Sequence, residues 1–292
     1  KKKVILDVDT GTDDAIAIMT AVMSENLEVL GVCAVNGNRG IDFTTENTLR
    51  VVEYLGKDIP VFRGCSLPMV VSLTEGRRED IPYKGPKDPQ DNVHGDYIDL
   101  PPATIQEQPV SAVRWLVDTL MASEGDIILI PVGPLTNIAM ALRIEPRIAQ
   151  KIKRIVIMGG GCREVNITPT AEFNFWIDPE AAKIVFDCGC DILVVPLDAT
   201  HAAAVSIRTA EALERKGTKP ATLTARIIRQ RQNAYKHWQP MADIDSVPVH
   251  DALAVCAVLD ESVLGPVVET YADVDIGKGA ADGMSIFDLD NR

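Results

Sequence analysis

The chain has 292 residues, of which 46% are apolar, and its formal net charge is −13. Such an acidic chain lacks the basic surface with which nucleic-acid binders meet phosphates, and no run approaches the roughly 18 apolar residues that span a bilayer. We therefore expect neither a nucleic-acid nor a membrane partner. Because α/β folds of this length often form one unit, we expect a single domain over residues 1–292.

The six cysteines form no CxxC pair and no zinc-finger spacing with histidine, and most lie in apolar stretches. This usage is typical of reduced core thiols in a cytoplasmic protein. The apolar run that follows Lys1–Lys3 is too short for the core of a signal peptide. We therefore expect a cytoplasmic location.

In chain order, apolar runs of strand length alternate with amphipathic segments of helical length. The expected strands cover residues 4–6, 27–35, 127–132, 155–158 and 192–197. The expected helices lie near 13–24, 42–56, 109–124, 134–144, 178–188 and 206–216. Continuous apolar runs suit parallel strands that are buried on both faces. The alternation predicts an α/β fold, with a mainly parallel open sheet flanked by helices and a Rossmann-like core.

Two stretches interrupt this rhythm. Residues 66–108 are rich in proline and glycine, and residues 217–248 read as an Arg/Gln-rich helix followed by a loop that contains proline. Long irregular connections in compact domains are usually functional or disordered. We expect both to be mobile segments that act as lids over a site.

Polar residues follow each of the five expected strands. They occupy 7–14, 36–38, 133–137, 159–161 and Asp198. In open parallel sheets the ligand site lies beyond the C-terminal ends of the strands. We therefore expect the active site at this edge.

The first of these clusters holds four carboxylates, on Asp7, Asp9, Asp13 and Asp14. Acids at a helix start favour the helix dipole, but that role suits one or two of them rather than four. Carboxylates so close together repel one another unless a cation neutralises them, and hard divalent cations prefer oxygen ligands. Gly11 allows the tight turn that the motif requires. The segment predicts a divalent-metal site.

Two other patterns compete for this segment. An EF-hand loop fails, because Gly11 and Ile18 stand where acidic or amide ligands are required. A haloacid-dehalogenase-type phosphatase also begins with a strand that ends in DxD, and Asp7 would then be its nucleophile. That alternative stays open, although it leaves Asp13 and Asp14 without a role.

The segment VILDVDTGTDDA closely resembles the opening signature of the nucleoside hydrolases, a family of Ca²⁺-dependent N-ribohydrolases. Further stretches resemble the family in the correct order over roughly residues 4–260. They are NGN at 36–38, PVGPLTNIA at 131–139, MGGG at 158–161, AEFNFWIDPEA at 171–181 and VHDA at 249–252. The resemblance implies hydrolysis of ribonucleosides to ribose and free nucleobase.

The resemblance also implies the site residues. Ca²⁺ would be bound by the carboxylates of Asp9, Asp14 and Asp251 and by the backbone carbonyl of Val132, with Asp7 as support. Valine stands at 132 where the family often has threonine, but a main-chain ligand tolerates the change. The substrate would be held by Asp13, Asn38, His94, Asn166, Glu172 and Asn174.

The catalytic roles implied are a general base and a proton donor. Asp9 would activate a metal-bound water, and His250 would protonate the leaving base. A histidine at this position resembles the branch of the family with broad or pyrimidine specificity, so we expect a nonspecific or pyrimidine-preferring enzyme. Tyr235, Trp238 and Gln239 could touch the base from the 217–248 segment. A non-catalytic nucleoside-binding protein remains the other alternative, and the family suggests a homodimer or homotetramer.

Overall fold

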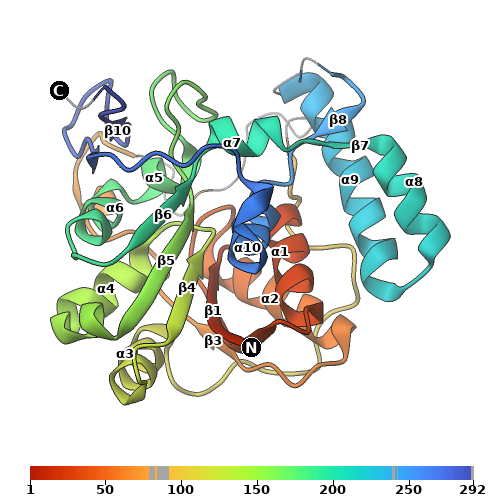
Figure 1. Cartoon of the computed structure of the whole chain (residues 1–292), viewed down its shortest axis with the longest axis horizontal. Helices are drawn as coiled ribbons and strands as arrows, with labels where there is room; N and C mark the ends of the chain where they lie inside the picture. Colours follow the sequence, from red (N-terminus) through yellow and green to blue (C-terminus); the bar gives the residue numbers. More distant parts are fainter. Residues whose placement is uncertain (79–82, 84–91, 239–240, 242, 291–292) are drawn as a thin grey trace.

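The computed structural model describes residues 1–78, 83, 92–238, 241 and 243–290, with the side chains of 237 and 238 excluded (Figure 1). The expected mobile segments therefore lie partly outside the described residues. In the first, the described part includes a short 3-10 helix, η1 (Val71–Leu73). In the second, it forms the helix α9 (Lys219–Trp238).

Six parallel strands form the central sheet, in the order β3-β2-β1-β4-β5-β6. They are β1 (Lys2–Val8), β2 (Leu27–Ala34), β3 (Val61–Arg63), β4 (Ile127–Pro131), β5 (Ile152–Met158) and β6 (Ile192–Val195). The five expected strands are all present, and the predicted α/β class is confirmed. Because β1 lies between β2 and β4, the residues after β1 open at the middle of the sheet's C-terminal edge.

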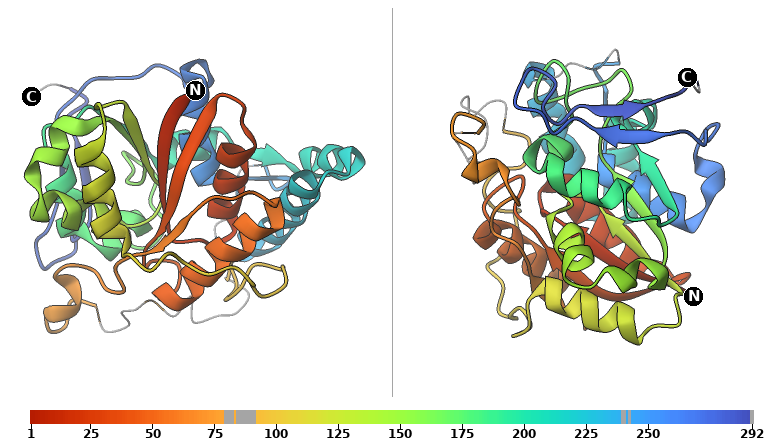
Figure 2. Two further views of the ribbon diagram at one scale, coloured as in Figure 1. Left: turned by 90° about the horizontal axis from the view of Figure 1, so that it is seen from below. Right: turned by 90° about the vertical axis from the view of Figure 1, so that its left-hand side faces the viewer.

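Helices cover both faces of the sheet (Figure 2). Alternate residues of β1 enter two cores: Val4, Leu6 and Val8 face one, and Ile5 faces the other. The first core packs α1 (Thr12–Met23), α2 (Ile41–Leu55) and α10 (His250–Leu259). The second packs α3 (Ala112–Ala122), α4 (Thr136–Ile144) and α6 (Pro179–Phe186). The buried faces of the helices thus hold the strand ends in place.

Three smaller groups complete the fold. Short helices are α5 (Phe173–Ile177), α7 (Leu197–Ala202), η3 (Pro146–Lys151) and η4 (Glu261–Val263). Helix α8 (Ile207–Lys216) pairs with α9 at one side of the molecule (Figure 1). Two antiparallel ribbons join β7 (Val205–Ser206) to β8 (Ser246–Val247) and β9 (Ala272–Val274) to β10 (Ser285–Phe287). Within the described residues, no helix combines the length and apolarity needed to cross a membrane.

Candidate active site

The acidic turn after β1 is organised by its own backbone. The chain leaves the strand at Asp9 and enters α1 through Gly11, which is the residue before its first turn. Asp14 turns back and accepts hydrogen bonds from the backbone N–H groups of Gly11 (2.9 Å) and Asp9 (3.1 Å). These amide groups would otherwise lack partners at a helix start. Asp14 therefore fixes the turn on which Asp9 and Asp13 are displayed.

Asp9 is held between two glycine backbones. A Cβ atom on Gly37 would lie 2.1 Å from its Oδ2, and one on Gly133 would lie 2.7 Å from its Oδ1. Asn38 donates its backbone N–H to Oδ2 (2.7 Å) and its side-chain amide to the Asp9 carbonyl (3.2 Å). The loops after β2 and β4 thus leave this carboxylate one narrow slot, which only glycine permits.

Asp7 lies beneath this site. Its Oδ2 accepts a hydrogen bond from Asn137 Nδ2 (2.8 Å), and the same amide donates to the carbonyl of Ala34 (3.0 Å). Burial raises the pKa of Asp7 to about 7. The supporting position expected for Asp7 agrees with these contacts. The phosphatase alternative needs Asp7 as an accessible nucleophile, and a 2% exposed carboxylate under the turn does not provide one.

Carboxylates from opposite ends of the chain meet above it. Oxygens of Asp13, Asp14 and Asp251 lie within 4.8 Å of one another, and all three residues are buried. Asp251 reaches this place because α10 packs along α1. The carboxylates predicted to bind the metal were those of Asp9, Asp14 and Asp251. The three that the structure brings closest together include Asp13 instead of Asp9.

The donor set fits a hard cation. Burial, with repulsion from neighbouring acids, raises the pKa of Asp9 and Asp251 well above the ordinary value and that of Asp14 to about 7. Buried carboxylates without a counter-charge are costly, and a divalent ion with oxygen preference removes that cost. Val132 lines the adjoining pocket, and its carbonyl accepts a hydrogen bond from Asn174 Nδ2 (2.9 Å).

These groups open onto one pocket. It is lined by Asp9, Asp13, Asn38, Arg39, Tyr83, Asn92, Val93, His94, Val132, Met158, Asn166, Ile167, Glu172, Phe173, Asn174, Arg231, Tyr235, His250 and Asp251. Every predicted site residue is among them except Asp7 and Asp14, which lie behind the wall. The structure therefore brings together residues that the sequence spreads over more than two hundred positions.

One wall carries the amide and carboxylate groups predicted to hold a sugar. Glu172 caps α5, accepting hydrogen bonds from the backbone N–H groups of Asn174 (2.9 Å) and Gly160 (2.9 Å). Burial raises the pKa of Glu172 to about 7. Asn166 Oδ1 accepts from the N–H of Phe173 (2.9 Å). The hydrogen bond from Gly160 therefore ties Glu172 to the loop that follows β5.

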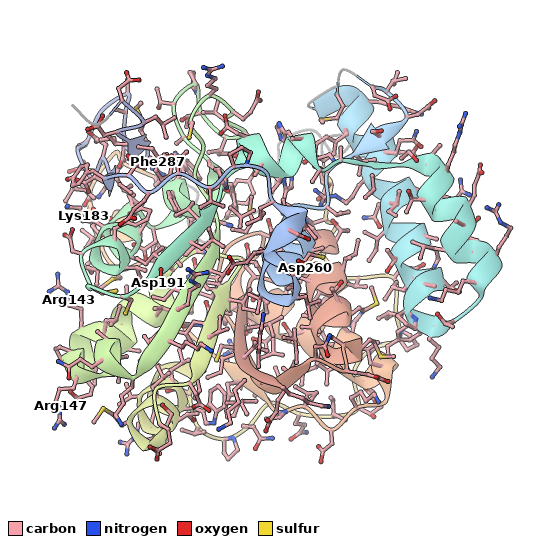
Figure 3. The ribbon with its side chains drawn as sticks, in the orientation of Figure 1. Arg143, Arg147, Lys183, Asp191, Asp260 and Phe287 are labelled. Carbon is pink, nitrogen blue, oxygen red and sulfur yellow. The ribbon has the colours of Figure 1, made fainter. Side chains whose placement is uncertain are left out.

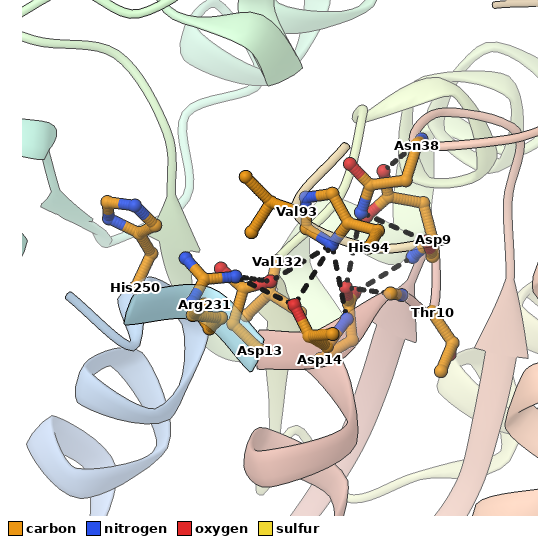
Figure 4. A network of polar contacts seen from close by, with 12 residues as sticks. Asp9, Thr10, Asp13, Asp14, Asn38, Val93, His94, Val132, Arg231 and His250 are labelled. Atoms are coloured by element: carbon orange, nitrogen blue, oxygen red, sulfur yellow. Dashed lines mark hydrogen bonds and ion pairs between the residues drawn. The ribbon is translucent and has the colours of Figure 1, made fainter. Parts of the chain in front are cut away.

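His94 lies across the acidic turn (Figure 4). Its Nδ1 accepts a hydrogen bond from the backbone N–H of Thr12 (3.1 Å) and lies 3.6 Å from Asp13 Oδ1. Burial lowers the pKa of His94 to about 4, so the ring is neutral at pH 7. In that state Nε2 carries the proton and can donate a hydrogen bond.

Arg231 is the residue that sequence reasoning missed. It is 1% exposed, and its Nη1 pairs with Asp13 Oδ1 at 2.9 Å. Burial acts to raise the pKa of Asp13, but Arg231 and two histidines outweigh it and hold that pKa below its ordinary value. An Arg/Gln-rich helix suggests a solvent-exposed face. The available signal was that Arg231 lies four residues from both Ile227 and Tyr235, on the buried face of α9.

His250 belongs to a chain of three hydrogen-bonding side chains. Its Nδ1 lies 2.7 Å from Thr200 Oγ1, and its Nε2 lies 2.7 Å from Tyr235 Oη. Burial and then Arg231 lower the pKa of His250 to about 3. The imidazole is therefore neutral at pH 7, whereas a histidine donor is usually thought of as charged. Tyr235 lines the pocket as expected, but the side chain of Trp238 and all of Gln239 lie outside the described residues.

Known proteins resemble this chain over its whole length. Residues 4–292 match the family described as inosine-uridine preferring nucleoside hydrolase. The pyrimidine-specific ribonucleoside hydrolase RihB of Escherichia coli O157:H7 is 37% identical over 293 residues, covering 99% of this chain and 88% of that protein. A solved plant nucleoside hydrolase has a TM-score of 0.85 and 31% identity, covering 100% and 88%. The purine-preferring ribonucleoside hydrolase from Gardnerella vaginalis has 0.84 and 27%, covering 99% and 89%.

Proposed function

The chain belongs to the nucleoside hydrolase family, and from that premise we propose that it cleaves ribonucleosides by direct attack of water, with Asp9 as general base. The reaction is hydrolysis of the N-glycosidic bond to ribose and free nucleobase. The observation that carries the proposal is the meeting of Asp13, Asp14 and Asp251, with oxygens within 4.8 Å of one another, next to Asp9 at one pocket. A non-catalytic nucleoside-binding protein would not need this concentration of buried acid.

Calcium is the cofactor that we propose. Its ligands would be carboxylates of Asp9, Asp14 and Asp251 with the carbonyl of Val132, and Asp13 lies near enough to the last two acids to share in the set. A bound calcium ion supplies a water of lowered pKa and a grip on the ribose diol. The hard oxygen donors and the raised pKa values of the acids support an ion of this class.

Asp9 has the properties of a general base. Asn38 and the two glycines that flank it fix the carboxylate in one orientation. Burial and the nearby Asp14 raise its pKa well above the usual range, which makes it a stronger proton acceptor than an exposed aspartate. Water that loses a proton to Asp9 attacks the anomeric carbon as positive charge develops on the ribose. Asp13, held ionised by Arg231, can accept a hydrogen bond from a ribose hydroxyl.

We propose that the leaving base receives its proton through Tyr235. Thr200 Oγ1 donates to the Leu197 carbonyl (3.2 Å), so it accepts from Nδ1–H of the neutral His250 imidazole, and Nε2 accepts from the Tyr235 hydroxyl. Tyr235 lines the pocket, and its hydroxyl, held by His250, is the group that we propose as the proton donor. The tyrosinate that remains accepts a hydrogen bond from Arg231 Nη2 (3.3 Å) and regains its proton from solvent after the base departs. This assignment keeps His250 in the catalytic machinery and gives its neutral form a role.

We propose that the enzyme prefers pyrimidine nucleosides or acts on both base classes. RihB, at 37% identity, is named pyrimidine-specific, whereas the Gardnerella vaginalis enzyme, at 27%, is named purine-preferring. We also propose that the chain acts as one catalytic domain in a cytoplasmic homodimer or homotetramer. The free state of all six cysteines agrees with a reducing compartment.

A nucleoside panel tests the proposed function. Uridine, cytidine, inosine, guanosine and adenosine are incubated with enzyme in Ca²⁺ or in chelator, in water enriched in ¹⁸O. We expect free base and ribose labelled at C1, fastest from the pyrimidines, and loss of turnover in chelator. Nucleosides that bind and are recovered intact would establish the binding-protein alternative instead.

A further inference from the structure

A hairpin near the C-terminus contacts three segments that shape the pocket. It consists of β9, β10 and the loop between them, residues 272–287, and we call it the C-terminal hairpin. It lies beside α5 and α6 at the edge of the molecule (Figure 1). None of its residues lines the described pocket. Its contacts nevertheless fall on the segments that carry Tyr83, Phe173 and Asn166.

The strongest of these contacts is a buried charge cluster. Asp282 accepts hydrogen bonds from Arg77 Nε (2.8 Å) and Nη2 (2.7 Å), and from Arg78 Nη1 (2.9 Å). Arg77 also pairs with Glu180 of α6. The side chains of Arg77, Arg78 and Asp282 are 4–6% exposed. A bidentate arginine–carboxylate pair at this depth is directional as well as strong, so Asp282 fixes both arginines in place.

Arg78 carries the contact onward to an aromatic group. Its guanidinium lies 4.2 Å from the centre of the Trp176 ring and donates to the Trp176 carbonyl (3.0 Å). Tyr83 meets the edges of Trp176 and Phe173, with ring centroids 6.5 and 5.1 Å apart. Tyr83 and Phe173 both line the pocket. The aromatic wall of the pocket is thus packed on a tryptophan that Arg78 covers.

The C-terminal hairpin also contacts α5 and the loop that follows β5 directly. A Cβ on Gly283 would lie 2.8 Å from the Trp176 Cα, so the hairpin backbone abuts α5. Ser285 Oγ accepts from the Gly161 N–H (2.9 Å) and donates to the Gly161 carbonyl (2.8 Å). These contacts place the hairpin behind the loop that ends at Asn166 and behind the helix that follows Glu172.

We propose that Asp282 is a positioning residue for substrate binding, acting through Arg77 and Arg78 on the wall formed by Tyr83 and Phe173. The inference rests on the proposed ribonucleoside hydrolysis, for which that wall contacts the substrate. Removing the Asp282 charge leaves Arg78 without its carboxylate partner and frees its guanidinium from Trp176. The wall then loses its fixed position while Asp9 and its water are untouched.

The test compares Asp282→Asn with Asp273→Asn. Asp273 lies on β9 of the same hairpin, is half-buried and pairs with Lys183 of α6 at 2.8 Å. Figure 3 shows Lys183 near Phe287 at the edge of the molecule. With uridine, we expect Asp282→Asn to raise KM by about 5- to 30-fold and to change kcat less than threefold, the range for a lost orienting contact of roughly 1–2 kcal/mol. Asp273→Asn should leave both parameters within twofold.

The split between KM and kcat separates positioning from plain destabilisation. A fraction of unfolded enzyme lowers apparent kcat and leaves KM alone, so that result, or an unchanged KM, would overturn the inference. If Asp282→Asn does not fold, Arg78→Lys keeps the charge without the planar stacking and should still raise KM by about 3- to 10-fold. If the wild type releases no base, the proposed function fails, and the same comparison is made with the calorimetric Kd for uridine.

Discussion

Among single residues, Asp9 carries the proposed chemistry. Asp9→Asn keeps the shape of the side chain and an oxygen for the Asn38 N–H, but removes the charge and the proton acceptor. We expect a loss of turnover of at least about 10³-fold with an unchanged circular dichroism spectrum. A steady-state assay on uridine measures this. An active Asp9→Asn enzyme would remove the assignment of the base.

The pairing of Tyr235 with His250 predicts that the effect of losing either residue depends on the leaving group. His250→Ala and Tyr235→Phe should each lower uridine turnover by about 10²–10⁴-fold, with little further loss in the double variant, because the two groups act as one path. A 4-nitrophenyl riboside is the control, since nitrophenolate departs without a proton. Its hydrolysis should survive both changes. An equal loss on both substrates would show that His250 serves structure rather than proton transfer.

Sequence reasoning predicts the acidic residues of the site better than their partners. Asp7, Asp9, Asp13 and Asp14 are crowded within eight residues of sequence, so their repulsion can be inferred without a fold. Arg231 and Thr200 enter the site only because α9 and α7 pack over the strand ends, which no local spacing reveals. The state of His250 was also out of reach, because its low pKa arises from burial and from Arg231.

At the scale of elements, the loops after β2 and β4 position Asp9, the proposed general base, because their glycines leave space for its carboxylate. In Gly37→Ala the new methyl would lie 2.1 Å from Asp9 Oδ2 and must displace it. We expect at least about 10²-fold lower kcat, the cost of misplacing a catalytic group by about 1 Å. Gly265→Ala is the matched control, because nothing lies within 4 Å of its Cβ. Similar activity in the two variants would contradict the claim that Gly37 is needed to position Asp9.

Five strands of the central sheet could be predicted because their apolar runs are continuous. The edge strand β3 was missed, since three residues give no periodicity to read. The two-residue partners β7 and β8 and the three-residue strand β9 were missed for a related reason. Their pairing is set by tertiary contacts such as those of Asp282, and short strands carry little local signal.

For the whole molecule, the buried acids link stability to pH. Burial raises the pKa of Asp7 and of Asp14 from the ordinary 3.8 to about 7 in the folded protein, so folding takes up protons between about pH 4 and 7. The free energy of unfolding in chelator should therefore fall as pH rises through this window. Thermal melts from pH 5.5 to 8 measure it. A free energy of unfolding that rises toward pH 8 in chelator would contradict the raised pKa values of Asp7 and Asp14.

Calcium should reverse this trend, because it binds the deprotonated carboxylates. At about 100 times its Kd, the ion contributes roughly 2.7 kcal/mol, or about 5 °C in Tm for a chain of this size. We expect the larger increase at pH 8 and a smaller one at pH 5.5, where protons compete. Magnesium, at the same concentration, is the comparison ion.

All of these predictions depend on one hard cation that is shared by acids from both ends of the chain. Calorimetric titration of the chelator-treated protein with Ca²⁺ tests it most directly, with uridine turnover followed on the same samples. We predict one ion per chain, activity restored in proportion to occupancy, and at least tenfold weaker binding in Asp251→Asn. Full turnover in chelator, or calcium binding that Asp251→Asn leaves unchanged, would contradict the account.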